Sequence, residues 1–244
     1  MEDVLIAELH EAGTAGIIEE PDGEEPGGLR AFFADELVAP TLLQRFAAFL
    51  PQLRHEEDVD WERATRDAWP PLLVGERFYL AAPWNTDAAP GGRIRLEIHP
   101  GMVCGTGRHP CTQLCLEALE RSVGPGMTVL DVGSGSAILA DAARLLGAAR
   151  VIACDVDFDA VRIARERVHV PMFAGSVDAV RAGVADVVVA NISSAVSEEL
   201  GPEFERVRRA GSTLILSGFP ADDLPEGCQP GELLCRDGWA CVIC

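Results

Sequence analysis

The sequence predicts an α/β fold: a doubly wound, Rossmann-like parallel sheet preceded by a small α+β module. Two observations support this prediction. From about residue 71 onward, short apolar stretches typical of buried strands alternate with amphipathic stretches of helical period, the pattern of a parallel sheet covered on both faces. Before residue 55, two helical and two strand patterns surround an acidic turn. We therefore expect three parts: a module at 1–55, a linker helix at 56–70 and the sheet domain at 71–244.

The elements of the module follow from apolar spacing and from turn residues. Residues 4–13 (VLIAELHEAG) have helical spacing, and the acidic Gly/Pro stretch PDGEEPGG separates two short strands. In chain order we expect a helix at 4–13, strands at 16–20 and 29–34, and a helix at 40–50. Residues 55–69 (HEEDVDWERATRDAW) are charged and helical in spacing, as suits a connecting helix.

The sheet domain begins with two strand patterns that we expect to pair, RFYLAAPW and RIRLEIHP. A glycine-rich loop, GMVCGTGRHPCT at 101–112, follows them. Further strands are expected at 127–132, 150–156, 170–175, 185–191, 212–219 and 233–243, and helices at 112–123, 137–147, 159–168 and 196–209. In a sheet of this kind, ligands bind at the carboxyl ends of the strands.

The charge of the chain restricts its partners. With 39 acidic and 20 basic residues the formal net charge is −19. Such a surface repels phosphate, so we expect no direct nucleic-acid partner, and a basic protein is the partner that this field attracts. The apolar runs are too short for a membrane span and the start is acidic, which predicts a cytoplasmic protein. The eight scattered cysteines predict small buried thiols and no metal site.

Polar residues and glycines fall where the predicted strands end. LDVGSGSAIL places Asp131, Gly133 and Gly135 after one strand, while Asp155 and Asn191 end two others. A glycine turn brings backbone N–H groups to a ligand, and an acid at the next strand end can accept both hydroxyls of a ribose. The pattern predicts a cofactor that contains adenosine.

Glycine spacing separates the cofactor classes that share this logic. A dinucleotide fold calls for a third glycine at the position that Ile138 occupies here, which disfavours NAD. The motif reads D-x-G-x-G-x-A and resembles motif one of S-adenosylmethionine-dependent methyltransferases. An ordinary strand-to-helix turn without a ligand is the remaining alternative, and the acid and the Asn at neighbouring strand ends argue against it.

The order and separation of GMVCGTGRHPCT, LDVGSGSAIL, CDVD and VVVANIS resemble the bacterial methyltransferases that modify ribosomal protein L11. The likeness is strong from about residue 60 to 220 and weak in the first 55 residues. It implies a methyltransferase sheet, S-adenosylmethionine as cofactor, and transfer of a methyl group to an amine of a basic, ribosomal-protein-like substrate. It also implies that 1–55 is a substrate-recognition module that lacks its first strand.

The resemblance assigns roles by position. Thr112 would bind the amino-acid moiety of the cofactor, Gly133 its neighbourhood at the turn, Asp155 the ribose and Asn191 the reactive end. Asp131, the leading Asp of the motif, would steady the turn. His109 matches the family's loop, and a capping or packing role is its alternative reading.

The chain departs from the family pattern at five positions: Cys104 (usually Phe), Arg108 (Thr), Cys111 (Thr), Ala137 (Gly) and Ser193 (Leu). We expect Arg108 and His109 near the acceptor. Arg108 could repel a cationic lysine there, so that Arg108→Thr would raise activity, or it could turn outward to pair with a surface acid.

No catalytic base is nominated from the sequence, because in-line methyl transfer depends on alignment and exclusion of water, and burial alone lowers the pKa of a lysine acceptor. Asn191 is not followed by Pro-Pro-aromatic, which argues against a nucleobase or glutamine-amide acceptor. Two alternatives stay open: a small-molecule methyltransferase, favoured by the shortened module, and a cofactor-binding relative without catalysis, favoured by the altered loop.

Overall fold

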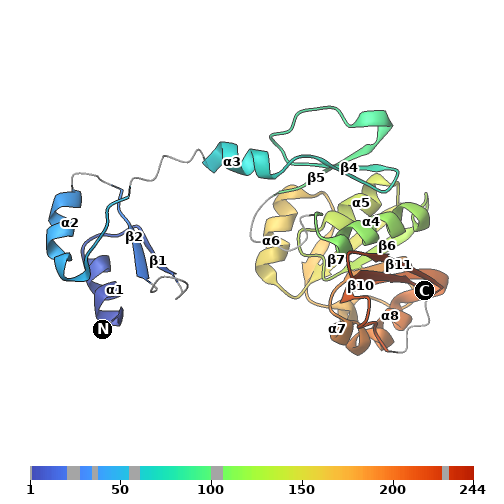
Figure 1. Cartoon of the computed structure of the whole chain (residues 1–244). Coiled ribbons are helices and arrows are strands. Elements are labelled where there is room, and N and C mark those ends of the chain that lie inside the picture. The colour runs from blue at the N-terminus through green and yellow to red at the C-terminus, as the bar shows by residue number, and fades with distance from the viewer. Residues whose placement is uncertain (1, 21–27, 35–37, 55–60, 100–106, 227–230) are drawn as a thin grey trace. The chain divides into compact units, whose positions relative to one another are not determined.

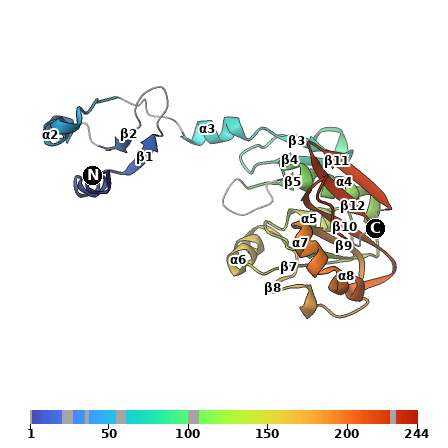
Figure 2. The same ribbon diagram turned by 60° about the horizontal axis from the view of Figure 1, so that its bottom comes forward.

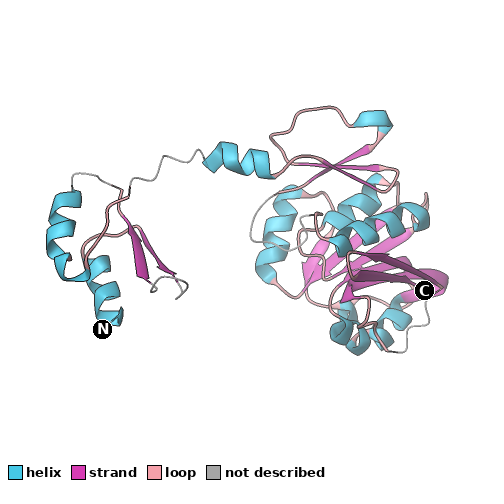
Figure 3. Cartoon of the chain, in the orientation of Figure 1, coloured by secondary structure: helices cyan, strands magenta, loops and turns pink. Residues whose placement is uncertain are grey.

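The computed structural model describes residues 2–20, 28–34, 38–54, 61–99, 107–226 and 231–244. The chain divides into two compact units, Met1–Asp60 and Trp61–Cys244. Figure 1 labels their elements, and Figure 3 colours them by type. The predicted α/β fold class is confirmed: the second unit contains a seven-stranded, mostly parallel sheet.

The first unit is a small α+β arrangement. Its elements are α1 (Glu2–Glu11), β1 (Gly16–Glu20), β2 (Gly28–Phe32), α2 (Ala39–Arg45) and the 3₁₀ helix η2 (Ala47–Phe49). Strands β1 and β2 form an antiparallel pair with Gly16 opposite Phe32. Leu9 of α1 and Phe46 after α2 are buried and provide its apolar centre among the described residues.

The second unit starts with α3 (Trp61–Ala68) and a three-stranded sheet. This sheet has the order β3-β4-β5, from Leu72–Val74, Phe78–Ala81 and Ile94–Glu97. Strand β4 runs antiparallel to β3 and parallel to β5, and all four of its residues are buried. The short 3₁₀ helix η3 (Pro90–Gly92) precedes β5.

The large sheet has the strand order β11-β12-β10-β9-β6-β7-β8; β12 runs antiparallel to both of its neighbours, and the other pairs are parallel. Its strands are β6 (Thr128–Val132), β7 (Arg150–Asp155), β8 (Met172–Ala174), β9 (Ala185–Asn191), β10 (Arg208–Pro220), β11 (Glu232–Arg236) and β12 (Trp239–Ile243). The helices of this region are α4 (Pro110–Ser122), α5 (Ile138–Leu145), α6 (Phe158–Arg167), η4 (Val177–Ala179), α7 (Ser194–Glu199) and α8 (Gly201–Val207). Figure 2 shows the strands side by side.

Alternate side chains of the central strands enter two separate apolar cores, as the period of two in a strand requires. Val187 and Val189 of β9 belong to the core that includes α4 and α5, while Val188 belongs to the core that includes Phe204 of α8. Both faces of the sheet are therefore covered, which explains why its strands read as continuous apolar runs.

The structure differs from the sequence prediction near residue 200. One helix was expected over 196–209, but α7 ends at Glu199 and α8 begins at Gly201 with Pro202 in its first turn. Proline lacks the N–H that would continue α7 and is favoured at a helix start, which explains the break.

The cysteines only partly follow the expectation of buried thiols. Cys111, Cys115, Cys154 and Cys241 are buried and free, but Cys235 is exposed and Cys244 is disulfide-bonded. Among the described residues, no helix is both long enough and apolar enough to span a membrane.

Candidate active site

Three neighbouring strands bring the predicted polar residues to one edge of the large sheet. Asp131 lies near the end of β6, Asp155 ends β7 and Asn191 ends β9. Strand β6 pairs in parallel with both β7 and β9, so all three carboxyl ends meet at the same edge. The segments LDVGSGSAIL, CDVD and VVVANIS are thus adjacent in space.

The turn after β6 depends on glycine. Gly133 and Gly135 have φ angles of 70° and 51°, in the left-handed region that glycine adopts without strain. A Cβ on Gly133 would lie 2.6 Å from Cγ2 of Ile192, so only glycine fits there. The N–H groups of Gly133 and Ser134 both donate to the carbonyl of Cys154, at 2.9 and 3.0 Å, which fastens the turn to β7.

Asp131 connects the end of β6 to the start of α5. Its Oδ2 accepts the N–H of Ala140, in the first turn of α5, at 3.0 Å, while its Oδ1 is buried and has no hydrogen-bond partner among the described residues. Burial raises the pKa of Asp131 to about 7, the Ala140 N–H opposes this shift, and the charge of Asp155 adds to it. The side chain therefore titrates near neutral pH.

The Asp155 carboxylate, at the end of β7, is held by two backbone N–H groups. Its Oδ2 accepts the N–H of Gly135 at 2.7 Å and its Oδ1 accepts the N–H of Asp157 at 2.9 Å. Each carboxylate oxygen retains a further lone pair, so the group can still accept two hydroxyls. The carboxylate thus ties the glycine turn to the start of α6 while keeping accepting capacity.

Asn191 and Thr112, 79 residues apart in the chain, are in contact. The Asn191 Nδ2 donates to Thr112 Oγ1 at 3.2 Å. Thr112 is 1% exposed on α4, and Asn191 is half-buried at the end of β9. Among the described residues, the amide oxygen of Asn191 and the hydroxyl proton of Thr112 have no other partner, so they can bind a polar group.

Gly218 supports this corner and was missed in the sequence. At φ 105° it forms a bulge in β10, and a Cβ there would lie 2.4 Å from the carbonyl oxygen of Ile192, directly after Asn191. The Ile192 N–H also donates to the carbonyl of Ser217 at 2.8 Å. The available signal was an isolated glycine inside the strand pattern STLILSGF, which marks a bulge or a close backbone approach.

The end of the glycine-rich loop enters the same region. Gly107 is buried with φ 78°, and a Cβ there would lie 2.4 Å from Leu80 Cδ2 and 3.0 Å from Ile138 Cδ1. His109 is the N-cap of α4: its Nδ1 accepts the N–H of Cys111 at 3.3 Å, and its ring packs edge-on against Trp239 at 4.5 Å between centroids. In this geometry His109 caps α4 and packs against Trp239, the alternative role named for it from the sequence.

The five departures from the family pattern have different surroundings. Cys104 lies outside the described residues, and Cys111 is a buried thiol in α4. Ala137 has a left-handed backbone with φ 60°, and Ser193 is the N-cap of α7, with its Oγ accepting the Val196 N–H at 3.5 Å. Arg108 directs its guanidinium to Pro70 and Trp69 and makes no ion pair with an acid among the described residues.

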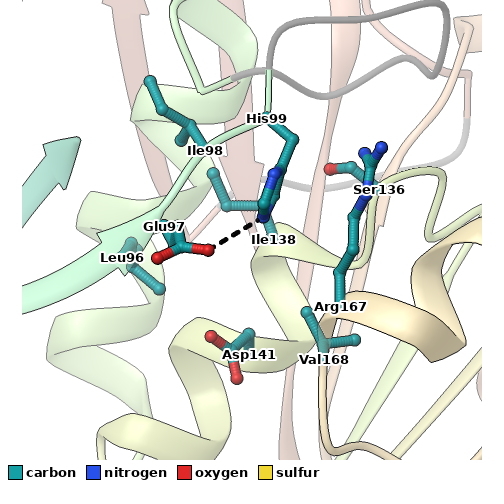
Figure 4. Close-up of a pocket in the computed structure, with 9 residues that line it drawn as sticks. All are labelled: Leu96, Glu97, Ile98, His99, Ser136, Ile138, Asp141, Arg167 and Val168. Atoms are coloured by element: carbon teal, nitrogen blue, oxygen red, sulfur yellow. Dashed lines mark ion pairs between the residues drawn. The ribbon is translucent and has the colours of Figure 1, made fainter. Parts of the chain in front are cut away.

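A small cavity with both polar and apolar lining lies beside α5 (Figure 4). It holds about 40 Å³ and is lined by residues of β5, the turn, α5 and the end of α6: Leu96, Glu97, Ile98, His99, Ser136, Ile138, Asp141, Arg167 and Val168. His99 Nε2 lies 3.1 Å from Glu97 Oε1; burial and the charge of Arg167 lower the pKa of His99, and Glu97 partly opposes this. Ligand pockets measure roughly 300–1,000 Å³, so this cavity is too small for a nucleoside cofactor.

Comparison with known proteins shows to which family the chain belongs. The profile of the ribosomal protein L11 methyltransferase family (PrmA) matches residues 28–226. The chain belongs to the ribosomal protein L11 methyltransferase family. It is 39% identical over 201 residues to the enzyme of Cupriavidus taiwanensis, covering 78% of this chain and 67% of that relative.

Other members of the family extend the likeness. The ribosomal protein L11 methyltransferase of Bordetella bronchiseptica is 36% identical over 241 residues, which cover 91% of this chain and 77% of that protein. The crystal structure of ribosomal protein L11 methylase from Lactobacillus delbrueckii subsp. bulgaricus superposes with a TM-score of 0.65 at 25% identity, covering 71% of this chain and 96% of that one. The resemblance seen in the sequence is thus confirmed.

As a member of the ribosomal protein L11 methyltransferase family, the protein is an S-adenosylmethionine-dependent methyltransferase. The residues present are suited to that cofactor. The turn has no Cβ at Gly133 and Gly135, Asp155 has accepting capacity for a ribose, and a partly buried polar pair lies nearby at Thr112 and Asn191.

Proposed function

We propose that this protein transfers methyl groups from S-adenosylmethionine to amino groups of ribosomal protein L11. The observation that carries the proposal is the meeting of the glycine turn, Asp155 and the Asn191–Thr112 pair at one sheet edge, in a chain of this family. A reaction on a ribosomal protein belongs in the cytoplasm, where we place the enzyme.

Each polar residue of the edge has a proposed role in holding the donor. Asp155 accepts the ribose hydroxyls, Thr112 binds the amino-acid moiety, and the N–H groups around Gly133 and Gly135 approach the ligand closely. Asn191 lies at the reactive end. Asp131 does not touch the donor in this scheme; it holds the turn to α5 through the Ala140 N–H.

The chemistry requires alignment more than acid–base catalysis. When bound, the cofactor would supply a methyl group on a sulfonium, and an amine attacking that carbon in line would displace the neutral thioether. The protein must hold the amine in line with that group and keep water out. The amine must also be neutral, and burial lowers the pKa of a lysine because it disfavours the charged form. The amide oxygen of Asn191 can accept a hydrogen bond from an N–H of such an amine.

The charge distribution supports a basic protein acceptor. Residues 1–60 carry fifteen acidic residues and three arginines, so this quarter of the chain contributes most of the net charge of −19. An acidic surface attracts a basic protein and speeds their encounter. We propose that the first unit binds the acceptor and that the second unit holds the donor.

Tritiated methyl transfer to purified L11 tests the proposal. The sequence contains no lysine, since all 20 basic residues are arginine, so lysine methylation of the enzyme itself cannot contribute to the label. We expect label in the L11 band, mapped by mass spectrometry to lysine or the terminal amine. Binding of S-adenosylhomocysteine together with an unlabelled L11 band, over a range of pH and enzyme concentration, contradicts the proposed acceptor.

A further inference from the structure

Arg108 connects the donor region to a distant segment of the same unit. Its Nη2 donates to the carbonyl oxygen of Pro70, 38 residues earlier, at 2.6 Å, and its guanidinium carbon lies 5.1 Å from the centroid of the Trp69 ring. Its Nε is buried without a hydrogen-bond partner among the described residues. The guanidinium therefore contacts a main-chain carbonyl and an aromatic ring.

The backbone of Arg108 is fixed independently of its side chain. Its carbonyl accepts Nε2 of Gln113 at 2.8 Å, and Oε1 of Gln113 accepts Nη1 of Arg236 at 3.0 Å. Arg236 also forms an ion pair with Glu117 at 2.9 Å. Helix α4 and the end of β11 thus hold the position from which the Arg108 side chain extends.

The segment that Arg108 contacts is where the second unit begins. Trp69 and Pro70 lie between α3 and β3, and α3 starts at Trp61, directly after the first unit ends at Asp60. Trp69 packs against the core that includes α4 and α5. Trp69 therefore contacts both the core and the Arg108 guanidinium.

We propose that Arg108 is a positioning residue that clamps the segment arriving from the first unit to the start of α4, four residues before Thr112. This inference rests on the proposed function, in which the first unit binds the acceptor. In-line transfer is sensitive to displacements of about 1 Å between donor and acceptor. Loss of the clamp therefore lowers acceptor turnover while donor affinity stays unchanged.

Arginine is required by this geometry. A planar guanidinium can stack on an indole and donate to a carbonyl at the same time, whereas a lysine ammonium is a compact point charge. From the contacts with Trp69 and Pro70 we predict that Arg108→Thr lowers activity on L11, the opposite of what the sequence alone led us to expect.

The test compares Arg108→Lys, Trp69→Leu, their double variant and Trp69→Tyr in the full-length protein. For L11 as acceptor we expect kcat/KM to fall about tenfold in each of the first two variants, within the range that misplacement causes. The double variant should fall no further, because both changes remove one interaction. Trp69→Tyr keeps an aromatic face and should retain activity, and affinity for S-adenosylhomocysteine should stay within about twofold throughout.

Arg95→Lys is the matched control, since Arg95 also donates to main-chain carbonyls, but to those of Ala82 at 3.0 Å and Asp87 at 3.3 Å rather than to Pro70. It should leave kcat/KM unchanged. Additive losses, an equal loss of donor affinity, or full activity of Arg108→Lys would each overturn the proposal.

Hydrogen exchange separates failure of this inference from failure of the proposed function. If the wild type binds S-adenosylhomocysteine but does not methylate L11, the acceptor assignment fails and the clamp is judged by exchange alone. In Trp69→Leu we then expect amides at the start of α4 to exchange at least about fivefold faster, because the clamp no longer opposes local opening. Unchanged exchange there overturns the clamp.

Discussion

Residues 133–137 and residues 107–109 both contain glycine in left-handed conformations, but they are held by different means. The first segment is fastened by hydrogen bonds to the end of the neighbouring strand β7, at Cys154 and Asp155. The second is fastened by side chains from distant parts of the chain, including Leu80 and Trp239. The turn is therefore fixed by local hydrogen bonds, whereas the loop end depends on tertiary packing.

Gly107→Ala tests the packing side of this comparison and has the largest expected effect. The new Cβ would combine a left-handed backbone with a clash against Leu80, so we expect the free energy of unfolding to fall by about 2–4 kcal/mol. Urea unfolding followed by circular dichroism measures it. Gly183→Ala is the control, because Gly183 has φ 65° and a Cβ there would meet no atom within 4 Å, and it should lose only about 1 kcal/mol. Equal losses would show that packing at Gly107 is unimportant.

Asp155→Ala tests the contribution of the local hydrogen bonds that hold the glycine turn. The carboxylate orders the Gly135 N–H and is the proposed ribose acceptor, so S-adenosylhomocysteine binding should weaken by about 1.5–3 kcal/mol, the scale of hydrogen bonds to a charged group. Titration calorimetry measures the change. Asp159→Ala removes a 74% exposed acid four residues away and should bind like wild type. A loss below about threefold at Asp155 excludes it as the ribose ligand.

Asp131→Asn tests the carboxylate that accepts the Ala140 N–H, through the pH dependence of the free energy of unfolding. The folded-state pKa of about 7 lies above the ordinary 3.8, so the folded protein binds more protons than the unfolded chain between these values. Stability therefore falls as pH rises through that window, by at most about 1.4 kcal/mol per pH unit. The Asn variant lacks this contribution. Unfolding of both proteins in urea from pH 4.5 to 7.5 should show their difference changing with pH, and a constant difference contradicts the raised pKa.

Ala137→Gly has the smallest expected effect. Ala137 and Ala140 are both fully buried at the start of α5, but only Ala137 has a positive φ, of 60°. Glycine relieves that strain at 137 and costs about 1 kcal/mol in the helix at 140. We expect Ala137→Gly to be at least about 1 kcal/mol more stable than Ala140→Gly in thermal unfolding. Equal stabilities would mean that the turn is not strained at Ala137.

Features that depend on local sequence could be predicted, whereas contacts between distant residues could not. The strand ends at Asp131, Asp155 and Asn191 follow from apolar runs that stop at polar residues, and parallel strands bring such ends together. The contact of Asn191 with Thr112 could be expected only through the family resemblance, because it joins positions 79 residues apart. The orientation of Arg108 was unpredictable, since no local rule connects it to Trp69 and Pro70.

Binding of S-adenosylhomocysteine and of NAD to the full-length protein, measured by titration calorimetry, tests the central claim most directly. That claim is that the carboxyl edge formed by β6, β7 and β9 holds one adenosyl methyl donor. We predict a single saturable site for S-adenosylhomocysteine and no binding of NAD, for which the turn lacks the third glycine at Ile138. Absence of S-adenosylhomocysteine binding at millimolar ligand, or binding of NAD instead, would contradict the account.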